Sequence, residues 1–251
     1  MSIVAHTPGR FVWRERTTPD AGIAREFYSE LLGWTWEEVQ SIDGPYWVAY
    51  ADETRVGGLW RPPSGASMPV AWNSYLSVED VDAITRRAQE MGWKVFRPPT
   101  EIPGIGRFSV IADFAGAAVL PYRNVGPDPS PGEVAPPGAF CWESLVTSDI
   151  PRALREYGTL FGWRCQSSPS GEVPIFAVDD TRGGQVADVQ RAQQGPPRWL
   201  TYVRVMDASL CSSRVEKLGG KVVVPRVDIP QGTISFIADP GGAMFGLFQM
   251  A

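Results

Sequence analysis

Residues 27–34 are Phe-Tyr-Ser-Glu-Leu-Leu-Gly-Trp, and residues 156–163 are Glu-Tyr-Gly-Thr-Leu-Phe-Gly-Trp, an offset of 129 positions (156 − 27). The similarity continues along the chain. Residues 111–117, Ile-Ala-Asp-Phe-Ala-Gly-Ala, recur at residues 237–243 as Ile-Ala-Asp-Pro-Gly-Gly-Ala, an offset of 126 (237 − 111). Solenoid repeats are much shorter, at roughly 20–50 residues. The repeat therefore indicates a duplicated domain.

A proline-rich stretch separates the two copies. Residues 124–137 contain five prolines and no apolar period, a composition typical of an exposed, extended linker. We therefore predict an N-terminal domain at residues 1–123, a linker at 124–137 and a C-terminal domain at 138–251.

Each copy is predicted to contain two βαβββ motifs. Residues 11–16 alternate like a half-buried strand. A helix then begins near Thr18, whose side chain can cap it, and ends at Gly33. The apolar face of this helix has a residue at every fourth position: Ile23, Phe27 and Leu31. Later helices are predicted to be capped by Asp80 and Asp207. Helices packed on antiparallel strands indicate an α+β fold.

Composition excludes several classes of function. The 251 residues have a net charge of −5, and 43% of them are hydrophobic. The sequence has no basic run for nucleic acid and no apolar segment long enough to span a membrane. Its first residues lack a basic head followed by an apolar run, so we expect no signal peptide. Its three cysteines lack metal-site or CxxC spacing, which favours reduced thiols in the cytoplasm. We therefore expect neither a nucleic-acid partner nor a membrane partner.

The motifs together resemble the vicinal-oxygen-chelate superfamily, which includes glyoxalase I, bleomycin-resistance proteins and extradiol dioxygenases. They are the Phe-Tyr-x-x-Leu-Leu-Gly-Trp stretch, Val-x-Asp-Val-Asp at residues 78–82 and Ala-Asp-Pro-x-Gly-Ala-x-Phe at residues 238–245. The resemblance covers residues 9–122 and 138–250. It implies two tandem glyoxalase-like domains with cup-shaped antiparallel sheets, as in two-domain "glyoxalase-like" proteins of actinobacteria. Such a chain is a monomeric pseudo-dimer or forms a homodimer.

The resemblance also implies where metal ligands would lie, and this sequence has no ordinary ligand at any of those positions. The six residues are Trp13, Asn73 and Leu120 in the first copy, and Trp142, Leu200 and Gly246 in the second. Iron, nickel and zinc favour imidazole, thiolate or carboxylate. The chain's one histidine, His6, precedes the first strand in a terminus expected to fray. We therefore expect no metal and no cofactor.

Tryptophan occupies the first of these positions in both copies. The chain contains ten tryptophans, and an indole offers a broad face for stacking and one N–H group for orientation. The candidate ligand-binding tryptophans are Trp13, Trp47, Trp60, Trp142 and Trp199, and the expected partner is a small aromatic molecule. The alternative for each of them is a position in the core.

A few polar residues are candidates for chemistry beside these indoles. Glu15 follows Trp13 by two residues, so both belong on one strand face; it is the candidate general base, and Ser144 is its counterpart in the second copy. Asn73 could bind or polarise a ligand, and Tyr75 and Tyr202 could supply hydroxyl groups. A surface charge at Glu15 and packing roles for the tyrosines are the alternatives.

Two functions follow. The first is a metal-free protein of the bleomycin-resistance type that binds and sequesters an aromatic natural product or drug. The second is a metal- and cofactor-independent isomerase, cyclase or lyase of secondary metabolism, with Glu15 as general base and Asn73 or Tyr75 stabilising an oxyanion. A metalloenzyme with displaced carboxylates and a scaffold without activity remain open alternatives.

Overall fold

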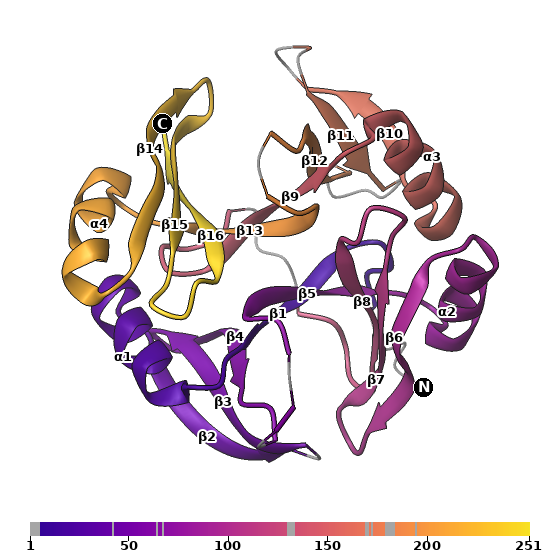
Figure 1. The fold of residues 1–251 in the computed structure, drawn as a ribbon, viewed down its shortest axis with the longest axis horizontal. Helices are drawn as coiled ribbons and strands as arrows, with labels where there is room; N and C mark the ends of the chain where they lie inside the picture. The colour runs from indigo at the N-terminus through magenta and orange to yellow at the C-terminus, as the bar shows by residue number, and fades with distance from the viewer. Residues whose placement is uncertain are drawn as a thin grey trace. The chain divides into compact units, whose positions relative to one another are not determined.

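The computed structural model describes residues 6–41, 43–63, 65–66, 68–129, 134–168, 171, 173–178, 184–193 and 195–251. Within these ranges the chain forms four βαβββ modules in sequence, as predicted (Figure 1). The first module consists of β1 (Phe11–Thr17), α1 (Ala21–Leu32), β2 (Thr35–Ser41), β3 (Gly44–Ala51) and β4 (Thr54–Trp60). The second consists of β5 (Ala71–Ser77), α2 (Val81–Glu90), β6 (Lys94–Ile102), β7 (Gly106–Ala112) and β8 (Ala118–Asn124).

The second repeat has the same order of elements. The third module consists of β9 (Phe140–Thr147), α3 (Ile150–Phe161), β10 (Arg164–Ser167), β11 (Pro174–Ala177) and β12 (Gln185–Arg191). The fourth consists of β13 (Arg198–Arg204), α4 (Ala208–Val215), the 3-10 turn η1 (Glu216–Leu218), β14 (Lys221–Ile229), β15 (Gly232–Ala238) and β16 (Met244–Met250).

Each repeat contributes one eight-stranded sheet. The strand orders are β2-β3-β4-β1-β5-β8-β7-β6 and β10-β11-β12-β9-β13-β16-β15-β14. Antiparallel sheets were predicted, but both sheets are mixed. The last strand of every module pairs in parallel with the first strand of that module. The helix crossover and two hairpins leave that last strand running in the direction of the first.

The compact units of the structure combine modules from both repeats. Unit 1 comprises Met1–Val12, Ser74–Ser130 and Glu143–Trp199, and unit 2 comprises Trp13–Asn73, Pro131–Trp142 and Leu200–Ala251. In unit 1, α2 packs against α3; in unit 2, α1 packs against α4 (Figure 1). Each unit has its own apolar core. The predicted domains at residues 1–123 and 138–251 therefore correspond to the two sequence repeats, and their existence as separate domains stays a prediction.

The helices begin and end at residues that suit those positions. The N-cap of α1 is Asp20, which accepts a hydrogen bond from the Ile23 amide at 3.0 Å, so the prediction of Thr18 was wrong by two residues. Gly33 ends the helix in the left-handed conformation, with φ of 74°. Ile23 is 52% exposed, because it lies outside the buried face of the helix, which Ala21, Ala24, Phe27, Tyr28 and Leu31 form.

Asp80 and Asp207 cap α2 and α4 as predicted. No helix in the described part of the chain is both long enough and apolar enough to cross a membrane.

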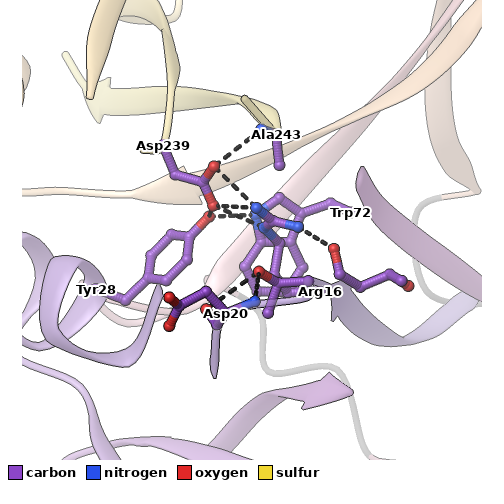
Figure 2. Close-up of polar contacts among 8 residues, drawn as sticks. Arg16, Asp20, Tyr28, Trp72, Asp239 and Ala243 are labelled. Carbon is purple, nitrogen blue, oxygen red and sulfur yellow. Dashed lines mark hydrogen bonds and ion pairs between the residues drawn. The ribbon is translucent and has the colours of Figure 1, made fainter. Parts of the chain in front are cut away.

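A buried ion pair joins the first and last modules in unit 2 (Figure 2). Arg16 is completely buried and donates from Nε and Nη2 to the two carboxylate oxygens of Asp239, at 2.7 and 2.9 Å. The Tyr28 hydroxyl donates to the same carboxylate at 3.0 Å and accepts from Nε1 of Trp72 at 2.8 Å. Burial, together with the charge of Asp239, raises the pKa of Tyr28 well above its usual value and keeps the phenol protonated as a donor.

Unit 1 repeats this network without the arginine. Tyr157 donates to Asp113 at 3.1 Å and accepts from Nε1 of Trp199 at 3.2 Å. The residue that corresponds to Arg16 by the repeat offset is Leu145, which is fully buried. Two backbone amides also donate to Asp113, yet burial raises the pKa of this carboxyl group above its usual value. The tyrosine and the aspartate of the repeated motifs are therefore hydrogen-bonded to each other in each core, as Tyr28 with Asp239 and as Tyr157 with Asp113.

The predicted terminus and linker meet in unit 1. Asp128 is buried, and its Oδ2 accepts hydrogen bonds from the Thr7 amide at 2.7 Å and from the Ser77 hydroxyl at 2.6 Å. Nδ1 of His6 lies 3.6 Å from Asp128 Oδ1. The prediction that this terminus frays is thus wrong at His6, and the linker is not exposed at Asp128. Residues 130–133 of the predicted linker lie outside the described residues.

The buried ion pair leads to a stability prediction. Replacing Arg16 by Leu leaves the Asp239 carboxylate buried without its cation, so the free energy of unfolding should fall by about 3–5 kcal/mol. The double variant Arg16→Leu/Asp239→Asn removes both charges and should recover part of this loss. Urea denaturation of the wild type, the two single variants Arg16→Leu and Asp239→Asn, and the double variant measures the coupling; strictly additive effects would contradict an interaction between the two side chains.

The raised pKa of Asp113 leads to a pH prediction. A carboxyl group whose pKa is higher in the folded state stabilises that state most at low pH, and the contribution is lost as pH rises through the folded pKa. The stability of the wild type relative to Asp113→Asn should therefore fall between about pH 4 and neutrality. Asp82 is the control, and its effect on stability should depend on pH in the opposite direction, because its hydrogen bonds from Arg107 lower its pKa. Its contribution should be lost as the pH falls.

Candidate functional site

The first module of unit 2 gathers several predicted residues on one face of its strands. Glu15 on β1 is the register partner of Gly58 on β4, and Thr17 is the partner of Trp60. Side chains alternate along a strand, so Trp13, Glu15 and Thr17 share this face with Gly58 and Trp60. We call it the Trp13 face: Trp13, Glu15, Thr17, Tyr46, Gly58, Trp60 and Asn73.

Tyr46 reaches across this face from β3. It is the register partner of Trp60, and its hydroxyl accepts a hydrogen bond from Nε1 of Trp13 at 2.8 Å. The ring passes over Gly58, where any side chain would overlap the hydroxyl group. Gly58 therefore makes room for Tyr46 beside Glu15, which agrees with the close backbone approach that a glycine in a strand suggests.

Asn73 and Trp60 complete the Trp13 face. The Asn73 side-chain amide donates to the Thr17 hydroxyl at 2.9 Å, and Nε1 of Trp60 lies 3.4 Å from the Asp43 carbonyl oxygen. Trp13, Glu15, Tyr46, Trp60 and Asn73 are all partly exposed. The face thus combines three aromatic rings with one carboxyl, one amide and two hydroxyl groups.

Trp47 lies on the opposite face of the same strands. It is 5% exposed within the unit 2 core, donates from Nε1 to Glu38 at 3.1 Å and lies beneath the guanidinium group of Arg25. The alternation that places Tyr46 on the Trp13 face directs Trp47 to the helix-covered side. We therefore omit it from the proposed site.

Other predicted site residues pack among buried aromatic side chains. Trp199 is part of the unit 1 core beside Tyr157. Tyr75, also in unit 1, packs against Phe108 and Tyr122. In unit 2, Tyr202 packs against Phe236, and its ring lies over Gly246. None of these three belongs to the Trp13 face.

The third module has a more polar arrangement at the equivalent register. Ser144 is the partner of Asp188 and lies 2.5 Å from its Oδ1, while Gln190 donates to Oδ2 at 2.6 Å. The carboxylate thus lies on β12, whereas in the first module it lies on β1 as Glu15. Trp142, the counterpart of Trp13, is partly exposed and falls in unit 2.

The residues present do not fit a metal. Trp13 and Asn73 carry uncharged side chains with hydrogen bonds of their own, and Leu120 and Leu200 are buried and apolar. At Gly246 the ring of Tyr202 fills the space that a ligand side chain would need. Among the residues that the structure describes, no three His, Cys, Asp or Glu side chains form a metal-sized group.

Sequence reasoning missed Tyr46, Thr17, Asp188 and Gln190. The sequence places Tyr46 beside Trp47 in one strand, and only the register shows which of the two faces Glu15. The signal that could have identified Tyr46 is Gly58, a glycine inside a strand. Asp188 lies opposite Ser144 in a ladder that the sequence does not specify.

The four βαβββ modules and their two eight-stranded sheets define a glyoxalase-like fold. Residues 10–119 match the model of the Glyoxalase/Bleomycin resistance protein/Dioxygenase superfamily. The whole chain is similar to the anthracycline biosynthesis protein DnrV of Streptomyces peucetius, with 30% identity over 97% of this chain and 94% of that protein. The chain therefore belongs to this superfamily, as its motifs predicted.

Two further comparisons agree. The putative glyoxylase CFP32 of Mycobacterium tuberculosis (strain CDC 1551 / Oshkosh) is 29% identical over 95% of this chain and 94% of that protein. The Mn(II)-bound glyoxalase from Novosphingobium aromaticivorans matches with a TM-score of 0.65 and 15% identity, over 96% of this chain and 82% of that one. The last likeness concerns the fold alone.

The glycine beneath Tyr46 gives a prediction. Gly58→Ala places a methyl group where the Tyr46 ring and hydroxyl lie, which should break the hydrogen bond to Trp13 and destabilise the fold by about 1–3 kcal/mol. Urea denaturation and tryptophan fluorescence measure the effect. Gly126→Ala is the matched control, because a methyl group there would meet nothing within 4 Å beyond its chain neighbours. Equal stability of the two variants would contradict the packing role of Gly58.

Proposed function

We propose that this protein binds a planar aromatic small molecule of secondary metabolism on its Trp13 face, without a metal or cofactor. The observation that carries the proposal is the grouping of Trp13, Tyr46 and Trp60 beside Glu15 and Asn73 on one partly exposed strand face. Sequestration of the ligand is the activity that this chemistry supports best.

The rings supply most of the binding energy in this proposal. An aromatic pair contributes about 0.5–1.5 kcal/mol beyond the burial of its area. The hydrogen bond between Trp13 and Tyr46 fixes two of these rings before a ligand arrives, which lowers the entropy lost on binding. The polar groups then select the orientation of the ligand.

The relatives support the metabolic setting. The similarity to a protein named for anthracycline biosynthesis extends over nearly the whole length of both chains. It supports a place in secondary metabolism for this chain. A cytoplasmic location, and a monomer or homodimer as the working form, remain our predictions.

A second candidate function is favoured by Glu15. Glu15 shares a strand face with the hydroxyl-bearing Tyr46, so it could act as the general base of a metal- and cofactor-independent isomerase, cyclase or lyase. In this role Asn73 would stabilise the developing negative charge on the substrate. Mass spectrometry of a bound aromatic compound after incubation separates the two functions, since a binding protein returns it unchanged and an enzyme converts it. Conversion that persists unchanged in Glu15→Gln would exclude Glu15 as the base.

The binding proposal predicts quenching of tryptophan fluorescence by a planar probe such as anthraquinone-2-sulfonate. The double variant Trp13→Leu/Trp60→Leu should weaken binding about tenfold or more, because it removes two stacking faces. Calorimetric titration gives the dissociation constants independently of the lost fluorophores.

Trp36→Leu is the matched control. Trp36 lies on β2 and donates from Nε1 to Ser29 of α1 at 3.0 Å, on the helix side of the strands. Its replacement should leave the affinity unchanged. Binding that the double variant retains in full, or that Trp36→Leu removes equally, would place the ligand elsewhere.

A further inference from the structure

Arg204, the last residue of β13, has a guanidinium group with only part of its hydrogen bonds made. Its Nη1 donates to the backbone carbonyl of Ala135 at 2.7 Å, the one acceptor that the described residues give it. Its Nε is buried and has no hydrogen-bond partner among those residues. A buried donor without an acceptor costs free energy, so an acceptor for Nε is expected.

Arg16, in the same unit, shows which acceptor fits such an arginine. Its Nη1 also donates to a backbone carbonyl, that of Thr17. Its Nε and Nη2 bind the two oxygens of the Asp239 carboxylate at 2.7 and 2.9 Å. This edge of a guanidinium group matches a carboxylate with two parallel hydrogen bonds. Arg204 has the same kind of backbone contact at Nη1, and the structure describes no carboxylate on its Nε edge.

Unit 1 has a carboxylate at the equivalent place. Ser77 is the last residue of β5, as Arg204 is the last residue of the equivalent strand β13. The Ser77 hydroxyl donates to Asp128 at 2.6 Å, and the Thr7 amide donates to the same carboxylate at 2.7 Å. The end of this strand is therefore a position where the fold accommodates a carboxylate.

Apolar side chains continue from Arg204 across the neighbouring strands. Its register partner on β16 is Phe248, and the partner of Phe248 on β15 is Ile234 (Figure 1). Register partners project from the same side of a sheet. Their strand neighbours Val203 and Leu247 lie in the core beneath α4, so these three residues lie on the opposite face. All three are partly exposed, and we call them the Arg204 row.

We propose that the Arg204 row binds a small aromatic carboxylate. The carboxylate group binds the Nε edge of Arg204, as Asp239 binds Arg16, and the aromatic ring lies on Phe248 and Ile234. Such a ligand supplies the acceptor that the buried Nε lacks and covers partly exposed apolar side chains. Because Nε is covered in the structure, the carboxylate reaches it through a side-chain rearrangement of the kind common on binding.

The site is on the fourth module and is separate from the Trp13 face, so this inference does not rest on the function proposed for that face. The test compares two probes of one shape, 2-naphthoate and the uncharged 2-naphthamide, by calorimetric titration. The wild type should bind the carboxylate about tenfold more tightly, the usual scale for a hydrogen bond to a charged group.

Three variants separate the two parts of the site. Arg204→Gln keeps a donor without its charge and should reduce the preference for the carboxylate to about twofold or less. Arg204→Lys keeps the charge without the planar fork and should retain only part of the preference. Phe248→Ala should weaken the binding of both probes and leave their ratio unchanged, because it removes a ring from the floor of the site.

Arg226→Gln is the matched control, since Arg226 lies on β14 and already pairs with Asp228 at 2.8 Å. It should keep the full preference. Because the readout is a ratio of two affinities on one variant, a loss of folded protein does not mimic the effect. Equal binding of both probes to the wild type, or a preference that survives Arg204→Gln, overturns the inference. A preference that disappears in Trp13→Leu/Trp60→Leu overturns it as well, because the carboxylate would then bind on the Trp13 face.

Discussion

The buried ion pair between Arg16 and Asp239 determines how unit 2 presents its candidate site. It fixes β1 from the core side, and the same carboxylate also holds the hydroxyl of Tyr28 on α1 (Figure 2). Because side chains alternate along a strand, an arginine held in the core directs Glu15 and Thr17 to the other face. The chemistry of the Trp13 face thus depends on a charge pair that faces away from it.

The two repeats have diverged in both their cores and their faces. Each core retains a tyrosine, an aspartate and a tryptophan in one hydrogen-bonded chain, but only one has the arginine. On the faces, the carboxylate has changed strands between the first and third modules. The residues that hold the fold are thus retained in both repeats, whereas those on the strand faces differ, as expected when one fold hosts different functions.

The sequence predicts the modules well, because strand alternation, aspartate caps and terminal glycines are local signals. It also names Trp13, Glu15, Trp60 and Asn73 as candidates, and the structure places these four on the Trp13 face. It does not separate Tyr46 from Trp47, since neighbouring residues on a strand differ only in the face that the register assigns. The sequence also does not show that modules from different repeats pair, because this pairing depends on long-range contacts such as Tyr157 with Asp113 in unit 1 and Arg16 with Asp239 in unit 2.

The interleaving of the modules gives the chain an order of folding during its synthesis. Unit 1 uses residues up to Trp199, whereas unit 2 needs β15, β16 and Asp239 near the end of the sequence. The first module, with its charged Arg16 and its apolar helix face, therefore cannot complete its packing until residues 200–251 are made, whereas unit 1 can assemble earlier. The carboxylate that neutralises Arg16 is among the last residues made. Residues 13–73, although made early, are thus among the last to become fully structured.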